Sequence, residues 1–296
     1  MPDLRDMQLL TSLARHNHFA RAAEECGISQ PAFSTRIRNL ERELGAPVVK
    51  RGNRFIGFTR EGEIVLTWAR RMMVDLDGLR QELEAARGAL TGRLSVGAVP
   101  TALAFVAQSP MRLRQAHPDL LIQVNSLSSS QIHQGLADFS LDAGVTYLDH
   151  ELPPGLTADP LYEERYVLIA SVSVAPRSEG PITWAEAATL PLCLLTRAMR
   201  NRRILDEVFE QAVGARPSPV METNAFTAAL AQVATGAAAT IAPAHLAESL
   251  EIAGDVVRLP LIEPEVRTPI GLVTTDRDPV PPAVSALVEA LKAASR

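Results

Sequence analysis

The sequence predicts a multidomain α/β protein with a small helical head, a long connecting helix and a two-lobed α/β body. The chain has 296 residues, whereas a single domain usually has ~100–200, so we expect more than one domain. Apolar residues recur at helical spacing as far as residue 90, and after it short apolar strands alternate with helices. We expect boundaries at 1–60 for the head, 61–91 for the connecting helix and 92–296 for the body.

The charge of the chain divides in the same way. The net charge of −5 alone would argue against a nucleic-acid partner. Residues 1–60, however, hold ten basic and six acidic side chains, a net charge of +4, which leaves −9 for the rest. This asymmetry predicts that the head, and not the body, contacts a polyanion.

The cysteine count and the N-terminus bear on the compartment. Cys26 and Cys193 lie far apart without metal-ligand spacing, so neither a disulfide framework nor a metal site is expected, and we expect no cofactor. The first residues do not resemble a signal peptide, and no apolar run is long enough to cross a bilayer. We therefore expect a cytoplasmic protein that does not contact membranes.

The first sixty residues predict three helices and a hairpin. The first helix ends near residues 15–18, Gly27 ends the second, and Ser29 caps a third that has Pro31 in its first turn. Its buried stripe is Phe33, Ile37, Leu40 and Leu44, and Gly45 is expected to end it. Residues 50–59 predict a β-hairpin with Gly52 and Asn53 at its tip.

Two helices joined by a tight turn predict a helix-turn-helix followed by a wing. Short or amide side chains at the start of the third helix suit base edges in a major groove, and arginines suit phosphates. The expected DNA-binding residues are Ser29, Gln30, Pro31, Ser34, Thr35, Arg38, Arg51 and Arg54. Two alternatives stay open: the helix positions could be ordinary surface, and Arg38 or Arg42 could pair with Glu41 or Glu43.

The same segment resembles the LysR-type transcriptional regulators. It carries Phe-x-x-Ala-Ala from Phe19, Ser-Gln-Pro-Ala-x-Ser from Ser29, Ile-x-x-Leu-Glu-x-x-Leu-Gly from Ile37 and Thr-x-x-Gly from Thr59, in order and without gaps. Three positions depart from the family pattern. Thr35 stands where Arg or Gln is usual, which would alter base preference, and Val49 and Phe58 are expected to be packing substitutions.

The connecting helix shows a heptad pattern. Its apolar positions are spaced alternately four and three apart, at Val65, Ala69, Met72, Leu76, Leu79, Leu83, Ala86 and Leu90. This narrow stripe predicts a helix about 40–45 Å long that pairs with a second long helix. The alternative is packing on its own domain. The family resemblance implies a homodimer formed through this helix, and assembly into tetramers.

The body predicts two rounds of strand and helix. Strands are expected at 94–99, 120–124 and 141–148 in the first round and at 191–195, 220–222 and 239–242 in the second, with helices between them, which implies parallel sheets. This part resembles the LysR effector-binding domain, which is similar in fold to type 2 periplasmic binding proteins. We expect lobe I at about 92–163 and 268–296, lobe II at about 164–267, and crossings near 161–167 and 264–270.

The ends of these strands carry the candidate effector ligands. Hydroxyls and N–H groups at helix starts suit a small anion, so a carboxylate or an oxyanion is the expected effector. The candidates are Pro100, Thr101, Ser128, Ser129, Thr146, Thr196, Asn224 and Phe226, and the resemblance implies that Thr101, Ser128 or Ser129, Thr146 and Thr196 match the usual effector contacts. The alternative is that each Ser or Thr only caps its helix. The arginines after Thr196 are expected to be a charged helix start on the surface, although one could bind a carboxylate.

These features predict a sequence-specific, DNA-binding transcriptional regulator that senses a small molecule. Its expected partners are double-stranded promoter DNA, the effector, further copies of itself and RNA polymerase. No nucleophile, paired-carboxylate or phosphate-loop motif is present, so no catalytic residue and no enzyme activity are expected. The alternatives are an effector-independent DNA-binding protein and a solute-binding protein.

Overall fold

The computed structural model describes residues 2–50, 55–86, 88–108, 111–176, 180–250, 252 and 254–295. The chain forms two compact units. The N-terminal unit is Met1–Gly92 together with the short segments Asp138–Ser140 and Val280–Pro282, and the C-terminal unit holds the remainder.

Three helices form the core of the N-terminal unit: α1 (Leu4–His16), α2 (Phe19–Glu25) and α3 (Gln30–Leu44). The predicted boundaries of α3 are confirmed. The Ser29 hydroxyl caps its start by accepting a hydrogen bond from the Ala32 N–H, and Gly45 ends it in the left-handed region, at φ +69°. Arg36 ties α3 to α1, since its guanidinium bonds the carboxylates of Asp3 and Asp6 at 2.6 and 2.7 Å.

The wing begins on a buried carboxylate. Glu41, in α3, is 8% exposed and accepts hydrogen bonds from the backbone N–H groups of Val48 and Val49, at 2.9 and 3.1 Å. Val49 then forms an antiparallel bridge with Phe58. Both are buried, in agreement with the packing role expected of them. The predicted tip, with Gly52, Asn53, Arg51 and Arg54, lies outside the described residues.

The connecting helix is α4 (Arg60–Ala85). Its 26 residues span about 39 Å. The Thr59 hydroxyl caps it by accepting from the Gly62 N–H, and Ala86 is the C-cap. The prediction carried the helix on to Leu90, which is wrong: Leu90 lies after the helix and is buried.

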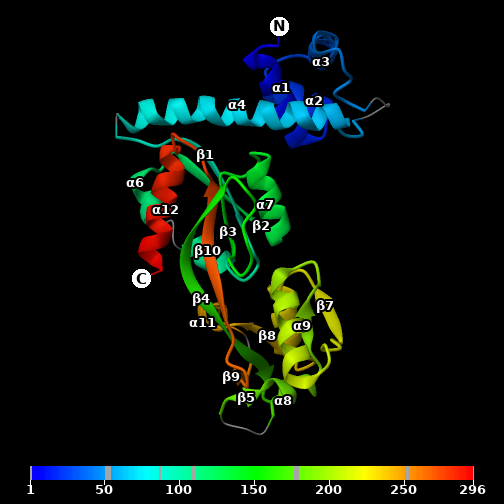
Figure 1. The fold of residues 1–296 in the computed structure, drawn as a ribbon, viewed down its shortest axis with the longest axis vertical. Helices are drawn as coiled ribbons and strands as arrows, with labels where there is room; N and C mark the ends of the chain where they lie inside the picture. The colour runs from blue at the N-terminus through cyan, green and yellow to red at the C-terminus, as the bar shows by residue number, and fades with distance from the viewer. Residues whose placement is uncertain are drawn as a thin grey trace. The chain divides into compact units, whose positions relative to one another are not determined.

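The C-terminal unit contains one eight-stranded sheet and one two-stranded sheet (Figure 1). The helices are α5 (Leu103–Gln108), α6 (Met111–Ala116), α7 (Ser129–Ala137), α8 (Trp184–Ala188), α9 (Arg200–Val213), α10 (Phe226–Ala234), α11 (Ala244–Ser249) and α12 (Pro282–Ala294). The strands are β1 (Gly92–Ala98), β2 (Leu120–Ser126), β3 (Ala143–Tyr147), β4 (Leu156–Ser171), β5 (Ile182–Thr183), β6 (Cys193–Leu195), β7 (Met221–Thr223), β8 (Thr240–Pro243), β9 (Val256–Ile262) and β10 (Arg267–Thr275).

The large sheet runs β2-β1-β3-β10-β4-β9-β5, with β8 also paired to β4. Strands β1 and β3 are parallel, as are β6 and β7, and these are the pairs that the strand–helix repeat predicts. The large sheet as a whole is mixed, because β10, which the strand–helix repeat did not include, is antiparallel to both β3 and β4.

Two lobes meet along β4 and β10 (Figure 1). Residues 156–165 of β4 pair with β10, which in turn pairs with β3 of lobe I. Residues 166–171 of β4 pair with β8 and β9 of lobe II. One hydrophobic core continues through both lobes. Strand β4 is therefore continuous through the junction, and a side chain in its middle lies between the lobes.

Substituting Gly62 by alanine is expected to destabilise the N-terminal unit by at least about 2 kcal/mol. A Cβ at this position would lie 2.0 Å from the Val48 carbonyl oxygen, so α4 and the wing strand could not keep their packing. Urea unfolding followed by circular dichroism measures the change. Gly180→Ala is the control, since a Cβ there meets nothing within 4 Å. Equal stability of both variants would contradict the close approach.

Candidate DNA interface and effector site

The outer face of α3 carries the predicted DNA-binding residues. Ser29, Gln30, Pro31, Thr35 and Arg38 are exposed, and Ser34 is half-buried. The opposite face is formed by Phe33, Ile37 and Leu40, which are at most 3% exposed. The prediction that Leu44 is buried with them is wrong, because this last residue of the helix is 38% exposed. Because the apolar stripe is used inside the unit, the polar N-terminal half of α3 is left for a partner.

The arginines of this face have neutral partners. The Arg38 guanidinium donates to the Thr35 hydroxyl at 3.1 Å, and the Arg42 guanidinium donates to the Asn39 side-chain oxygen at 3.0 Å. Glu41 is turned inward, where it accepts hydrogen bonds from the wing backbone. Within the part of the chain that the structure describes, the exposed Arg38 guanidinium is bonded to a hydroxyl, and such a group can contact a phosphate.

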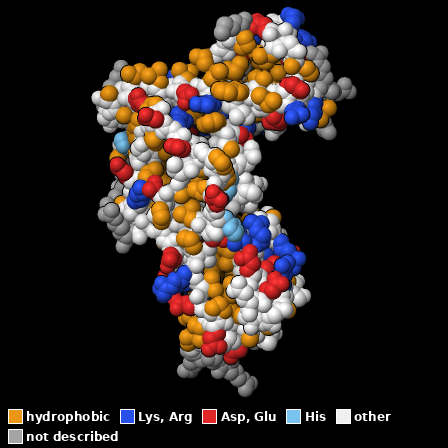
Figure 2. Space-filling view, viewed as in Figure 1, with side chains coloured by type: hydrophobic (Ala, Val, Ile, Leu, Met, Phe, Trp, Pro, Cys, Tyr) orange, Lys and Arg blue, Asp and Glu red, His pale blue; other side chains and the backbone are white. Residues whose placement is uncertain are grey.

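Helix α4 presents a stripe of exposed apolar side chains, which we call the α4 stripe: Ile64, Trp68, Met72, Leu79 and Leu83. Their exposures range from 43% to 59%, and Figure 2 shows hydrophobic side chains gathered along this helix. The predicted seam differs at its start. Ala69 is buried inside the unit, and Ile64 and Trp68, which the prediction did not include, are exposed in its place.

A buried carboxyl group lies at the junction of the two lobes. Glu164 is in the middle of β4 and is 0% exposed. Alternate residues of a strand share one face, so Glu164 points to the same side as Tyr162 and Tyr166. The Tyr147 hydroxyl, at the end of β3, donates to Glu164 Oε2 at 3.0 Å, and the Tyr166 hydroxyl lies 3.5 Å from the same oxygen.

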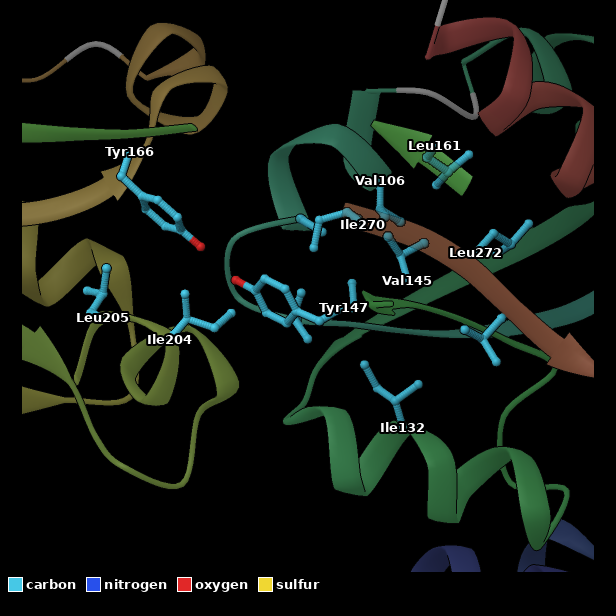
Figure 3. Packing of buried hydrophobic residues seen from close by; sticks show 14 of the residues in the cluster. Val106, Ile132, Val145, Tyr147, Leu161, Tyr166, Ile204, Leu205, Ile270 and Leu272 are labelled. Carbon is cyan, nitrogen blue, oxygen red and sulfur yellow. The ribbon is translucent and has the colours of Figure 1, made fainter. Parts of the chain in front are cut away.

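Hydroxyls from neighbouring elements extend this network, which we call the junction cluster: Thr101, Tyr147, Glu164, Tyr166 and Thr268. The Thr101 and Tyr147 hydroxyls are 3.0 Å apart, and those of Tyr166 and Thr268 are 3.2 Å apart. Figure 3 shows the hydroxyls of Tyr147 and Tyr166 directed toward one another. Glu164 Oε1 has no hydrogen-bond partner among the described residues.

Burial dominates the electrostatics of the junction cluster. It raises the pKa of Glu164 from 4.5 to about 7, although hydrogen bonds from Thr101, Tyr147 and Tyr166 act to lower it. No described Lys, Arg or His forms an ion pair with this carboxyl group within 4.0 Å. Burial, and next the charge of Glu164, also raise the pKa of Tyr147 and Tyr166.

Direct contacts hold the lobes together beside this cluster. Arg200, at the start of α9 in lobe II, bonds Asp149 of lobe I with its Nε at 2.7 Å, and its Nη1 bonds Glu207 at 2.8 Å. The ring of His245 in α11 lies 3.3 Å from the Thr101 carbonyl oxygen and packs edge-on against Tyr162. Burial lowers the pKa of His245, which keeps the imidazole neutral.

The structure places the predicted lobe I effector residues at one end of the sheet. Pro100, Thr101, Ser128 and Thr146 are buried, and Ser129 is half-buried. The Ser128 hydroxyl contacts the side chains of Ser130 and Gln131 at the start of α7, at 3.1 and 3.0 Å, so it serves the helix start. The Ser129 and Thr146 hydroxyls are buried and have no partner among the described residues.

The predicted lobe II residues are more dispersed. Thr196 is half-buried, and its N–H donates to the Thr223 carbonyl. Asn224 is exposed on the loop before α10, whereas Phe226 packs into a hydrophobic cluster with Leu195.

The expectation of a surface-exposed basic helix start is wrong for two of its members. Arg200 and Arg202 are 8% and 0% exposed. Arg202 bonds Asp206 at 2.7 Å and Glu222 at 2.5 Å, so its charge is compensated inside lobe II. Removing one member of such a buried pair leaves the other uncompensated.

Sequence reasoning missed Glu164, Tyr147 and Asn201. Asn201 is 1% exposed and neither of its amide atoms has a described hydrogen-bond partner. One signal in the sequence could have predicted the burial of Glu164. Alternate residues of a strand share one face, so a strand that buries Tyr162 and Tyr166 buries Glu164 as well.

The part of the chain that the structure describes contains no group of three His, Cys, Asp or Glu side chains placed to hold a metal ion. Within the same residues, no helix combines the length and apolarity needed to cross a membrane.

Two protein families match the chain. Residues 4–63 match the family described as bacterial regulatory helix-turn-helix protein, lysR family, and residues 87–296 match the LysR substrate binding domain. Relatives include the DNA-binding transcriptional dual regulator OxyR of Escherichia coli K12, which is 28% identical and aligns over 98% of this chain and 95% of its own. The SDS degradation transcriptional activation protein of a Pseudomonas species is 31% identical, over 97% and 94%.

Solved structures share the fold over the whole chain. A full-length OxyR variant from Pseudomonas aeruginosa has a TM-score of 0.77 at 22% identity and covers 99% of this chain and 95% of its own. The LysR family regulator CbnR has a TM-score of 0.71 at 21% identity with both chains fully covered, and CbnR in complex with its target DNA scores 0.71 at 22% identity, over 99% and 100%.

Replacing Glu164 by glutamine is expected to remove a pH dependence of stability. The unfolded carboxyl loses its proton near pH 4.5 and the folded one near 7, so wild-type stability falls as pH rises through this window, by up to about 3 kcal/mol. His245 and His133, whose pKa values burial lowers, contribute the opposite slope in both proteins. Thermal unfolding from pH 4.5 to 8, taken as wild type minus Glu164→Gln, isolates the carboxyl. A flat difference would contradict the raised pKa.

Proposed function

The chain belongs to the LysR family of DNA-binding transcriptional regulators, and from this membership we propose how its own residues carry out regulation. The head reads promoter DNA with α3, two copies pair through the α4 stripe, and the C-terminal unit binds a small effector at the ends of its strands. The observation that carries the proposal is the polar, exposed N-terminal half of α3 opposite a fully buried apolar face.

The proposed DNA contacts divide by chemistry. Gln30, Ser34 and Thr35 offer amide and hydroxyl groups to base edges, and Arg38 offers a charge to phosphate. Ser29 and Pro31 begin the helix, whose N-terminal N–H groups also suit a phosphate. We propose that Arg51 and Arg54 of the wing also contact the DNA.

Pairing of two copies follows from the α4 stripe. Exposed apolar side chains on one face of a 26-residue helix favour burial against a second helix. Two heads related by a twofold axis can read two half-sites on DNA. We also propose that the dimers assemble into a tetramer and that the regulator contacts RNA polymerase.

The effector site is proposed at the strand ends of lobe I, where Thr101, Ser128, Ser129 and Thr146 gather, with Pro100, Thr196, Asn224 and Phe226 as further members. The unpartnered hydroxyls of Ser129 and Thr146, beside the start of α7, support an anionic group there. Effector binding is linked to DNA binding through the positions of the lobes.

Several named relatives are hydrogen peroxide-inducible genes activators, and we propose that peroxide does not act on this chain through a thiol. Peroxide oxidises exposed thiolates of low pKa. Cys193 is 0% exposed and burial raises the pKa of its thiol, while Cys26 is 4% exposed in the core of the head. We further propose that the chain has no enzyme activity and acts in the cytoplasm, where its DNA lies.

Gln30→Ala is expected to weaken binding to the promoter of the regulated gene about tenfold or more and to relax base preference. Arg38→Ala is expected to weaken binding to all sequences and to lower the salt slope by about 1. Fluorescence anisotropy across salt concentrations measures both. Arg216→Ala, an exposed arginine of the C-terminal unit, is the control. Unchanged affinity in both α3 variants would contradict the interface.

Leu79→Glu is expected to convert the dimer to monomer, because a charge is placed in the centre of the paired helices. Sedimentation velocity ultracentrifugation reports the change. Arg80→Glu introduces the same side chain at the next position, 64% exposed, and is expected to leave the assembly intact. A Leu79→Glu protein that sediments like wild type would exclude pairing through the α4 stripe.

Hydrogen peroxide is expected to leave both thiols reduced in the folded protein. Counting free thiols after denaturation, before and after peroxide treatment, tests this, and promoter affinity is measured in parallel. Oxidation of Cys193 that changes promoter affinity would contradict the proposal. Treatment of the urea-unfolded chain is the control, since both thiols are then exposed.

A further inference from the structure

The guanidinium of Arg200 binds one carboxylate from each lobe. Arg200 is the first residue of α9 in lobe II and is 8% exposed. Its Nε and Nη2 lie 2.7 and 2.5 Å from Asp149 Oδ2, in the segment of lobe I that follows β3. Its Nη1 lies 2.8 Å from Glu207 Oε1, further along α9. We call these three residues the Arg200 triad.

The pair between Arg200 and Asp149 lies outside the strand that continues from one lobe into the other. The backbone pairing of β4 changes partner between Arg165 and Tyr166, from β10 to β8 and β9. A change of strand twist at this point tilts one lobe against the other without breaking either set of backbone pairs. Side-chain contacts between α9 and the segment after β3 therefore help to set the angle between the lobes.

The second carboxylate makes this contact releasable. Separating a buried ion pair normally leaves an uncompensated charge in the interior. When Asp149 moves away, however, Arg200 keeps Glu207, which belongs to the same helix and has a side chain that is 57% exposed. The Asp149 side chain is already 18% exposed, so it is hydrated as it leaves. Release therefore leaves neither charge buried and uncompensated.

Arg202, in the same turn of α9, shows the opposite arrangement. It is 0% exposed, and both of its carboxylate partners, Asp206 and Glu222, belong to lobe II. A movement between the lobes leaves these pairs intact. The start of α9 thus carries one arginine that stabilises lobe II and one that reaches across to lobe I.

We propose that the Arg200 triad is a releasable latch between the lobes. Arg200 bound to Asp149 holds the lobes joined, and Arg200 held by Glu207 alone lets them separate. This inference rests on the proposed function, in which effector binding is linked to DNA binding through the positions of the lobes. The effector then changes promoter affinity by changing how often the latch is joined.

The two carboxylates have opposite roles in a latch, although both bond the same guanidinium. Asp149→Asn leaves the Arg200 charge to Glu207 and is expected to raise the ratio of separated to joined lobes at least about threefold. Glu207→Gln is expected to lower this ratio, because release would then leave the buried guanidinium uncompensated. In an ion pair that only stabilises the fold, both substitutions would act in the same direction.

Distances between two spin labels measure this ratio in the full-length protein. The labels are placed at Gln115→Cys in α6 of lobe I and at Ala188→Cys in α8 of lobe II, which are exposed positions, whereas the native Cys26 and Cys193 are buried. Pulsed electron double resonance gives the distance distribution. Labelled chains are diluted into unlabelled ones, so that only distances within one chain are recorded.

Two further variants control the experiment. Glu210→Gln makes the same chemical change on the same helix but removes an exposed pair with Arg216 inside lobe II, so it is expected to leave the distances unchanged. Asp149→Glu keeps the charge and is expected to restore the joined population that Asp149→Asn loses. A melting curve of each variant establishes that it is folded. Shifts of Asp149→Asn and Glu207→Gln in the same direction, or no shift in either, overturn the latch.

Promoter affinity of the same variants separates the latch from the proposed function. Asp149→Asn and Glu207→Gln are expected to change this affinity in opposite directions. Opposite distance shifts without any change in promoter affinity support the latch and count against regulation through the positions of the lobes. Unchanged distances, with salt-dependent promoter binding retained, overturn the latch and leave the DNA interface standing.

Discussion

The antiparallel pairing of β4 with β10 is the constraint on which the C-terminal unit depends. Strand β4 continues past this pairing to β8 and β9, so the lobes share one strand as well as a core. A residue in the middle of such a strand can be neither removed to the surface nor repacked without disturbing both lobes. This explains how a carboxyl group is kept buried at Glu164, where hydroxyls rather than a cation surround it.

The N-terminal unit depends on two local contacts of the wing. The buried Glu41 carboxylate accepts hydrogen bonds from the first backbone N–H groups of the wing, and Gly62 lets α4 approach the Val48 carbonyl. These contacts orient α3, the wing strand and α4 within one unit. The polar side chains on the outer face of α3 are not needed for them and stay available to the proposed DNA partner.

The head was predictable from its sequence because local signals decide it. The Ser29 cap, the Gly45 stop and the spacing from Phe33 to Leu40 act within a few residues of each other, and the structure has them as expected. The parallel pairs β1–β3 and β6–β7 followed from the strand–helix repeat. The antiparallel pairing of β10 with β4 and the contact between the Tyr166 and Thr268 hydroxyls join residues more than a hundred positions apart, and the burial of Arg202 depends on Glu222 in a different element. Periodicity contains no information on such pairings.

The chain has two tryptophans, and the fold gives them different surroundings. Trp68 lies in the α4 stripe at 55% exposure, whereas Trp184 is 0% exposed, packs edge-on against Phe209 and donates its indole N–H to the Pro264 carbonyl. Trp184 also contacts Tyr166 of the junction cluster, with ring centroids 6.3 Å apart. The intrinsic fluorescence of the protein thus has two separable sources: a solvent-sensitive one on the surface that we propose for helix pairing, and a shielded one beside the junction of the lobes.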